Sequence, residues 1–175
     1  MNELHLHVPF FDELWYRKQL MEDPATMDYN RGYELCFDGY NPETGCIAFP
    51  EAEWRDWYNY YIGREPDRFY AYIVRDDGTF LGDVNVHRSD GHPWYEMGIV
   101  IEAKYRGQGY AAPALRLLLQ HAFEVMQADA VHNDFEDVRD AAVRAHLSAG
   151  FNVYRRENGL LELIITREQY EAAKA

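Results

Sequence analysis

The pattern of apolar and polar positions predicts a strand, a tight turn and a helix near the middle of the chain. Residues 94–101 are aromatic and β-branched, which is typical of a strand. Gly107 and Gly109 mark the turn that follows, and Pro113 then falls where the first turn of a helix tolerates its missing N–H. Apolar residues recur beyond it at helical spacing, at Leu115, Leu118, Leu119, Ala122 and Met126.

The rest of the chain alternates between shorter strands and helices. Strands are expected at 4–8, 69–75, 80–87, 130–135, 151–156 and 160–166, and helices at 12–21, 51–63 and 138–149, with a short helix after residue 166. Asp76-Asp77-Gly78-Thr79 and Glu157-Asn158-Gly159 indicate two hairpin turns. Residues 26–50 are rich in turn formers, so a long and partly irregular excursion is expected there. This order predicts a single mixed α+β domain over residues 1–175.

The turn at residues 106–111 has the features of a phosphate-binding site. Glycines let the backbone turn tightly and let a ligand approach without interference from a Cβ atom. Because the turn opens directly into a helix, free N–H groups and the positive end of the helix dipole face one point. Arg106 adds a cation suited to a pyrophosphate. The turn is not a P-loop, since no Gly-Lys-Ser/Thr follows, and it has too few glycines for the dinucleotide-binding G-x-G-x-x-G.

Two segments resemble one known family. Arg106-Gly107-Gln108-Gly109-Tyr110-Ala111 resembles the R/Q-x-x-G-x-G/A signature of the GNAT family of N-acetyltransferases. Downstream, residues 142–151 are similar to the end of the family's N-x-x-A-x-x-x-Y-x-x-x-G-F helix motif. The resemblance covers residues 68–166 well and residues 1–67 only in general pattern. It implies the GNAT fold, a mixed and mostly antiparallel twisted sheet with a splayed central strand pair and flanking helices.

The resemblance also implies a coenzyme site. In the family, the backbone amides of the first motif hold the pyrophosphate of coenzyme A, and the preceding strand hydrogen-bonds the pantetheine arm. Acetyl-CoA contacts are therefore expected along 106–111, which includes Gln108, Tyr110 and Ala111, and in the strand at Ile99, Val100 and Ile101. The implied splay separates this strand from 130–135. Backbone N–H groups of 97–101 would then be able to polarise the thioester carbonyl.

Length and composition agree with a globular domain of this kind. The chain has 175 residues, of which 47% are apolar, enough to bury a full core. No apolar run approaches the ~18–20 residues that span a membrane, and no signal-peptide pattern is visible. We therefore expect a cytoplasmic protein whose only cysteines, Cys36 and Cys46, stay reduced. No Cys/His spacing suggests a metal site.

The charge of the chain is −13 and is unevenly distributed. Residues 1–103 hold 20 acidic and 8 basic residues, a net −12, whereas residues 104–175 hold 10 and 9, a net −1. The near-neutral part suits an anionic coenzyme, and the acidic part would supply most of the acceptor side. An acidic cleft attracts cationic amines, although acidic residues also serve simply to solubilise a surface. The absence of a basic patch disfavours nucleic-acid binding.

Glu96 is the first candidate for the general base that an ammonium substrate requires. It lies in an otherwise apolar strand, where desolvation is expected to raise the pKa of its carboxyl towards neutrality. It shares a strand face with Gly98, whose missing side chain is expected to leave room for a ligand. The resemblance supports this role, because a glutamate at this point serves as the base in some GNAT members. A structural ion pair is the alternative.

The general acid is harder to assign, because the chain departs from the family motif. His146 stands where the family has its tyrosine, and Arg139 where it has its asparagine. An imidazolium can donate a proton near neutral pH, so His146 is the candidate acid, with a satisfied core histidine as the alternative. Arg139 is a candidate contact for a coenzyme phosphate, or else an exposed ion-pair partner. Tyr154 and Tyr110 are reserve hydroxyl donors.

The acceptor is expected to bind between residues 26–67 and the segment His87-Arg88-Ser89-Asp90, together with His92. An aromatic stripe recurs on one face of the predicted helix at 51–63, at Trp54, Trp57, Tyr58 and Tyr61. Such a stripe either binds a cation through its π faces or packs on the sheet. If it is exposed, it hints at a homodimer interface.

These features together predict an acetyl-CoA-dependent N-acetyltransferase that acts by direct attack of a primary amine. A CoA-binding sensor or interaction module without turnover is the alternative.

Overall fold

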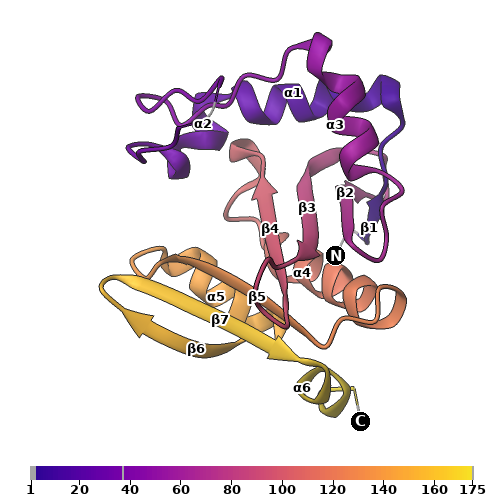
Figure 1. Ribbon diagram of the computed structural model, residues 1–175, viewed down its shortest axis with the longest axis vertical. Coiled ribbons are helices and arrows are strands. Elements are labelled where there is room, and N and C mark those ends of the chain that lie inside the picture. Colours follow the sequence, from indigo (N-terminus) through magenta and orange to yellow (C-terminus); the bar gives the residue numbers. More distant parts are fainter. Residues whose placement is uncertain (1–2, 37, 175) are drawn as a thin grey trace.

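The computed structural model describes residues 3–36 and 38–174 and is built around one seven-stranded sheet (Figure 1). The strand order is β1-β2-β3-β4-β5-β7-β6, and every neighbouring pair is antiparallel except β4 and β5, which are parallel. The strands are β1 (Leu4–His7), β2 (Arg68–Arg75), β3 (Phe80–Arg88), β4 (Tyr95–Ile101), β5 (Ala130–Glu136), β6 (Asn152–Glu157) and β7 (Leu160–Thr166). This is the mixed, mostly antiparallel sheet that the sequence predicts.

Helices cover both faces of this sheet. The helices are α1 (Leu14–Glu22), α2 (Pro24–Met27), α3 (Trp54–Tyr61), α4 (Ala111–Gln120), α5 (Asp140–Ala149) and α6 (Arg167–Ala172), and a π-helical turn (His121–Val125) continues α4. The first three gather at one end of the molecule, and α4 and α5 lie on the other side of the strands (Figure 1). No helix in the described ranges is long and apolar enough to cross a membrane.

The apolar side chains of β2 alternate between the two faces of the sheet, so helices have to bury both faces. Phe69, Ala71 and Ile73 join the larger hydrophobic cluster, to which α4 contributes Leu115 and Leu118. The intervening Tyr70, Tyr72 and Val74 join a second cluster with residues of α1. Each strand residue therefore enters a core on one side or the other, as period-2 geometry requires.

The aromatic stripe of α3 is a packing face. Trp57 contacts Tyr70 edge-on at 4.8 Å between ring centroids and stacks on Tyr61 at the same distance. Both Trp57 and Tyr61 pack against the second cluster. Of the two roles that the sequence left open for the stripe, the structure shows the packing role, so the stripe gives no support to a dimer interface.

β4 and β5 separate soon after they meet, which confirms the predicted splay. Two register pairs join them in the described chain, Tyr95 with Val131 and Glu96 with His132. Beyond these, β4 continues along β3 and β5 continues along β7. Figure 1 shows β5, β7 and β6 turned away from the direction of β2–β4. One edge of β4 from Met97 onwards thus has no strand partner on the β5 side.

Candidate active site

The Gly-rich turn lies between the end of β4 and the start of α4. Gly107 and Gly109 have φ angles of +73° and +84°, in the left-handed region that favours glycine. A Cβ atom built on either residue would meet no other atom within 4 Å, so the space in front of the turn is open. Both features match the sequence prediction of a backbone that a ligand can approach closely.

Arg106 anchors this turn to the N-terminal part of the chain. Its guanidinium donates to the carbonyl oxygens of Ala25 and Thr26, at 3.2 Å for the former, and forms an ion pair of 3.1 Å with Asp28. It also donates to Ile101 O at 3.1 Å. Carbonyls of α2 and a carboxylate thus occupy donors of Arg106 in this structure, and its contact with a coenzyme phosphate stays a prediction. These contacts hold the turn in place.

At the end of β4 the side chains pack into the protein, so the backbone is the part that a ligand can contact. Ile99 and Ile101 pack against the larger cluster, and Val100 belongs to the second one. Farther along, Gln108 donates to Lys104 O at 2.9 Å, and the Tyr110 hydroxyl lies 3.5 Å from the Arg75 guanidinium. Main-chain groups in the turn and in β4 are thus the groups that remain for a coenzyme.

Glu96 meets His132 at the last register pair before β4 and β5 separate. Glu96 Oε2 lies 2.8 Å from His132 Nδ1, and Glu96 Oε1 accepts from Trp94 Nε1 at 2.6 Å. Burial alone would raise the pKa of Glu96, but the hydrogen bonds from His132 and Trp94 outweigh it and lower the pKa below its ordinary value. The prediction of a pKa raised towards neutrality is therefore wrong, because the carboxylate has donors that the sequence did not reveal.

His132 is buried and lies between two carboxylates. Its Nε2 is 3.3 Å from Glu162 Oε2, on the side of the ring opposite Glu96. Burial alone would lower the pKa of His132, but the hydrogen bonds and charges of Glu96 and Glu162 outweigh it, so the pKa is raised. Trp94 stacks on the imidazole at 4.8 Å between centroids. The result is a fixed carboxylate–imidazole–carboxylate chain across β4, β5 and β7.

These groups line a cavity of about 370 Å³, which we call the polar pocket. Its walls are His92, Trp94, Glu96, His132, Asp134, Tyr154, Arg155, Leu160 and Glu162. Three carboxylates line it, together with one arginine and two histidines, so the pocket favours a positively charged guest. His92 continues the aromatic wall, stacked on Trp94 at 4.3 Å. Tyr154 lies in this pocket with its ring edge towards Trp94 at 5.8 Å.

Gly98 does not leave the space that the sequence suggested. A Cβ atom at Gly98 would lie 2.7 Å from Nδ2 of Asn85, so the Asn85 side chain already fills the position in front of this glycine. The Asn85 amide group therefore packs directly against the Gly98 backbone. The expectation of room for a ligand at Gly98 is therefore wrong.

His146 is a satisfied core residue, and the structure does not support it as the general acid. It is 2% exposed, its Nδ1 is 2.8 Å from Ala142 O, and its Nε2 is 2.9 Å from Asn133 Nδ2. The carbonyl requires a proton on Nδ1 and the amide requires a lone pair on Nε2, so the ring is neutral. Burial lowers the pKa of His146, which keeps it so near neutral pH. The one ring proton is already donated to the Ala142 carbonyl, so His146 has none available for a leaving group.

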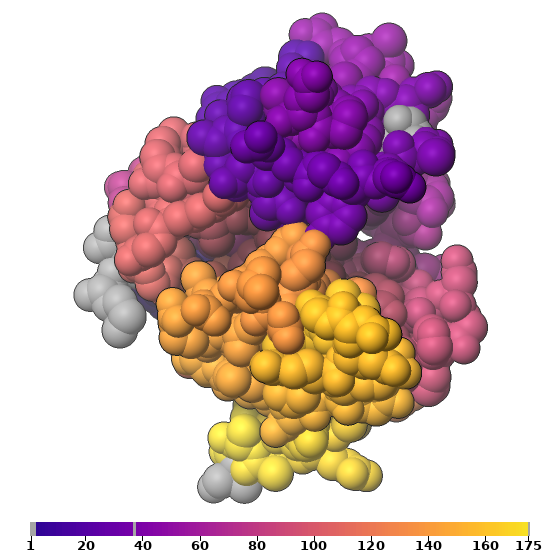
Figure 2. Space-filling model, turned by 90° about the vertical axis from the view of Figure 1, so that its left-hand side faces the viewer, coloured from indigo at the N-terminus to yellow at the C-terminus, as the bar shows by residue number. Residues whose placement is uncertain are grey.

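Arg139 bridges two distant parts of the chain. Its guanidinium donates to Tyr29 O at 2.8 Å and to the Tyr33 hydroxyl at 2.9 Å, and it pairs with Glu136 at 2.5 Å. Figure 2 shows the N-terminal part, in indigo, meeting the orange segment that contains β5 on this face of the molecule. Of the two roles predicted for Arg139, the structure shows the ion pair.

The walls of the polar pocket differ from the predicted acceptor region. Of the residues expected to bind the acceptor, His92 lines this pocket. The other walls come from the segment between Trp94 and Glu162, and none comes from residues 26–67. His132, Glu162 and Trp94 were missed as site residues. Trp94 and Glu96 are two apart, so period-2 alternation places them on one face, but only the β4–β5 register brings in His132.

A family model matches most of the chain, and solved structures share its fold. The model of the family "Acetyltransferase (GNAT) domain" matches residues 11–152. The chain belongs to the GNAT acetyltransferase family. No curated protein matches this GNAT chain. Its fold resembles that of a GNAT-family acetyltransferase from Bacillus anthracis, with a TM-score of 0.70, 17% identity, and coverage of 96% of this chain and 98% of that one.

Spermidine N-acetyltransferases from Vibrio cholerae are also similar in fold to this GNAT protein. One, in complex with CoA and spermine, has a TM-score of 0.75 at 17% identity, with coverage of 96% of this chain and 98% of that one. Another, a spermidine/spermine N-acetyltransferase in complex with manganese ions, has a TM-score of 0.70 at 14% identity, with coverage of 99% and 98%. At these identities the comparisons show the fold that the chains share.

Proposed function

We propose that this GNAT protein transfers an acetyl group from acetyl-CoA to the primary amine of a small molecule or peptide. Both substrates would be bound at once, and the amine would attack the thioester directly. The observation that carries the proposal is the position of the Glu96–His132 pair. The pair lies where β4 and β5 separate, and the other end of β4, the strand that carries Glu96, leads into the Gly-rich turn.

The coenzyme would bind through main-chain groups. The free N–H groups of the turn at 106–111 and the start of α4 suit the pyrophosphate. The unpaired edge of β4 at Ile99–Ile101 suits the amide groups of the pantetheine arm. Arg106 contributes by holding the turn against α2.

The Glu96–His132 pair would accept the proton that the amine must lose. A lysine-like ammonium has a pKa near 10.4, so roughly one molecule in a thousand is a neutral nucleophile at pH 7. Glu96 alone is a weak base, because its pKa is lowered. When His132 is neutral and its Nδ1–H donates to Glu96 at 2.8 Å, Nε2 carries the free lone pair on the Glu162 side, and the raised pKa of the ring favours proton uptake at that atom. We therefore assign the base to the pair, with Glu162 stabilising the imidazolium.

The remaining steps need little from side chains. The nitrogen lone pair forms a bond to the carbonyl carbon, and backbone N–H groups of β4 beyond Glu96 would stabilise the resulting oxyanion. The C–S bond then breaks and the sulfur leaves as a thiolate. Thiols ionise near pH 8.5 in model compounds, so this leaving group departs without the proton donor that His146 fails to provide.

The polar pocket would hold the acceptor. Glu96, Asp134 and Glu162 supply negative charge, and Trp94 supplies an aromatic face for an ammonium or its alkyl chain. The similarity to a protein that is in complex with CoA and spermine makes polyamines the first acceptors to test.

The direct test combines a thermal-shift titration with a thiol-release assay over polyamines, amino acids, aminoglycosides and peptide N-termini. A ligand at ~100 times its Kd stabilises the fold by about 2.7 kcal/mol. A shift with acetyl-CoA together with thiol release for a cationic amine supports the proposal. A shift without release for any amine favours a CoA-binding module instead, and no shift would contradict both.

A further inference from the structure

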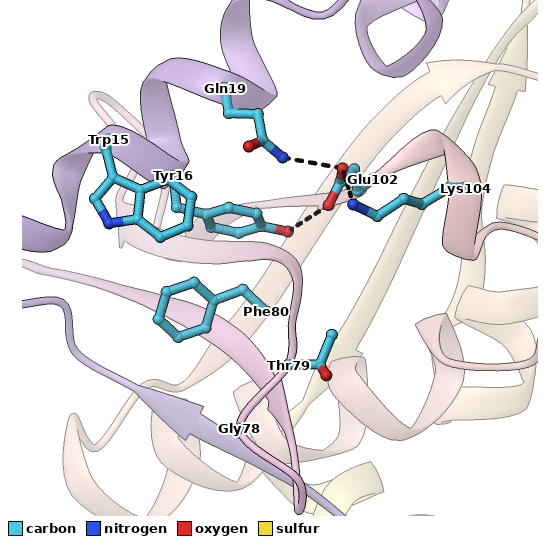
Figure 3. A pocket seen from close by; sticks show the side chains of 8 residues that line it. All are labelled: Trp15, Tyr16, Gln19, Gly78, Thr79, Phe80, Glu102 and Lys104. Carbon is cyan, nitrogen blue, oxygen red and sulfur yellow. Dashed lines mark hydrogen bonds and ion pairs between the residues drawn. The ribbon is translucent and has the colours of Figure 1, made fainter.

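A second cavity, of about 290 Å³, lies beside the residues that follow the end of β4 (Figure 3). It is enclosed by α1, by the turn between β2 and β3, and by the residues that follow β4. Its principal walls are Trp15, Tyr16, Phe80 and Glu102, with Lys104 at its edge. None of these residues lines the polar pocket.

Three aromatic rings form one side of this cavity. Tyr16 and Phe80 lie 5.0 Å apart between centroids, and Trp15 lies 5.7 Å from Tyr16 and 6.0 Å from Phe80. Trp15 is half exposed, although Tyr16 beside it is buried. An open tryptophan beside two further rings is the arrangement that attracts an organic cation through π faces.

A buried carboxylate forms the other side. Glu102 is 6% exposed, and its oxygens accept from Tyr16 Oη at 3.2 Å and from Gln19 Nε2 at 3.0 Å. Lys104 Nζ pairs with it at 2.8 Å (Figure 3). The Lys104 side chain is 59% exposed. The cation that balances Glu102 is therefore a solvent-exposed side chain rather than a buried one.

We infer that this cavity binds an organic cation, an alkylammonium or quaternary ammonium group, between the aromatic rings and Glu102. The ligand cation takes the place of the Lys104 ammonium on Glu102. The site is separate from the acceptor site, because Glu96 and Glu102 are six strand residues, or about 20 Å, apart. The binding of the cation does not depend on the proposed acetyl transfer, whereas its coupling to CoA rests on the proposed coenzyme site.

The exchange has a consequence for the coenzyme site. Lys104 lies two residues before Arg106, within the short 3₁₀ turn that leads into the Gly-rich turn. Once released from Glu102, its ammonium adds positive charge beside the turn that is proposed to hold phosphates. A cation in the cavity therefore raises the affinity for CoA, and CoA raises the affinity for the cation by the same factor.

Tetramethylammonium is the appropriate probe, because it carries no N–H group and cannot be acetylated. Its binding to the full-length protein is measured by isothermal titration calorimetry, with sodium chloride at equal ionic strength as the control. We expect saturable binding that Phe80→Leu and Glu102→Gln each weaken at least about tenfold. Glu96→Gln, the matched variant in the polar pocket, leaves this binding unchanged, and thermal melts confirm that each variant is folded.

Two further measurements test the exchange. Lys104→Ala removes the competing ammonium, so it binds the probe more tightly than the wild type does. Saturating probe raises the CoA affinity of the wild type about fivefold or more and leaves that of Lys104→Ala unchanged. The inference is overturned by an absence of saturable binding, by binding that only Glu96→Gln removes, or by a CoA affinity that the probe does not change.

Discussion

Glu96 and His132 are register partners in β4 and β5, and their side chains meet with Oε2 2.8 Å from Nδ1. The backbone thus fixes the contact, since parallel register partners place their side chains on the same face of the sheet. The same pair is the last before the strands separate. The sheet itself therefore places an ionised carboxylate and an imidazole beside the opening between the two strands.

The first prediction concerns the titration of His132. Glu96 contributes to the raised pKa of the imidazole, so Glu96→Gln lowers the pKa of His132. NMR titration of the histidine ring protons measures this shift directly. His146 is the internal control, because its pKa depends on burial and on Ala142 and is the same in both proteins. An unchanged pKa for His132 would show that the contact does not exist in solution.

The second prediction concerns stability against pH. The folded pKa of Glu96 is lowered, so its contribution is present above about pH 4.5 and is lost as the pH falls through the folded value. The folded pKa of His132 is raised, so its contribution is present below about pH 6.5 and is lost as the pH rises through the folded value. The pair thus stabilises the fold most between these values.

A double-mutant cycle with Glu96→Gln and His132→Asn measures this coupling by urea unfolding. We expect a larger coupling energy at pH 5.5 than at pH 8.5. A coupling energy that is equal at the two pH values would show that the pair does not titrate in this way.

The third prediction separates a structural from a catalytic role for His146. His146→Leu leaves the half-buried Asn133 amide without its acceptor, at a cost of about 1 kcal/mol in the free energy of unfolding. Turnover at temperatures where the variant is folded should stay within about twofold of the wild-type rate, which steady-state kinetics and urea unfolding will show. A large loss of kcat without a loss of stability would restore His146 as the proton donor.

The fourth prediction tests the Gly-rich turn with a matched control. Gly109 and Gly63 have φ angles of +84° and +68°, and a Cβ atom on either would meet no atom within 4 Å. Alanine at each position therefore incurs similar backbone strain, about 1–2 kcal/mol. Gly109→Ala should also weaken CoA binding at least about tenfold, because its methyl group enters the space in front of the turn, whereas Gly63→Ala should not. Equal CoA affinities would remove the turn from the coenzyme site.

The sequence predicts well what depends on local pattern. The strand, turn and helix around Gly107 and Gly109 follow from periodicity and from the backbone freedom of glycine, and the structure has them at the predicted residues. The splay of β4 and β5 came from the family resemblance. The sequence also left open that the α3 stripe packs on the sheet, which it does through Trp57 and Tyr61.

What the sequence could not predict depends on tertiary contacts. The lowered pKa of Glu96 comes from Trp94, two residues away, and from His132, 36 positions away. The hydrogen bonds of Arg106 to carbonyl oxygens of α2, about 80 residues earlier in the chain, are likewise invisible in the local pattern. Asn85 fills the space beside Gly98 because of the β3–β4 register, which periodicity does not determine.

The most direct test of the proposed function is the steady-state acetylation of a cationic amine by the wild type, by Glu96→Gln and by Asp134→Asn. Asp134 lines the same pocket, so its variant removes one negative charge without removing the proposed proton acceptor. We predict that Glu96→Gln lowers kcat by about 10²-fold or more, in line with the loss of a general base, while its Kd for acetyl-CoA is unchanged. Asp134→Asn should mainly raise KM for the amine. A Glu96→Gln variant that turns over at the wild-type rate would contradict the proposal.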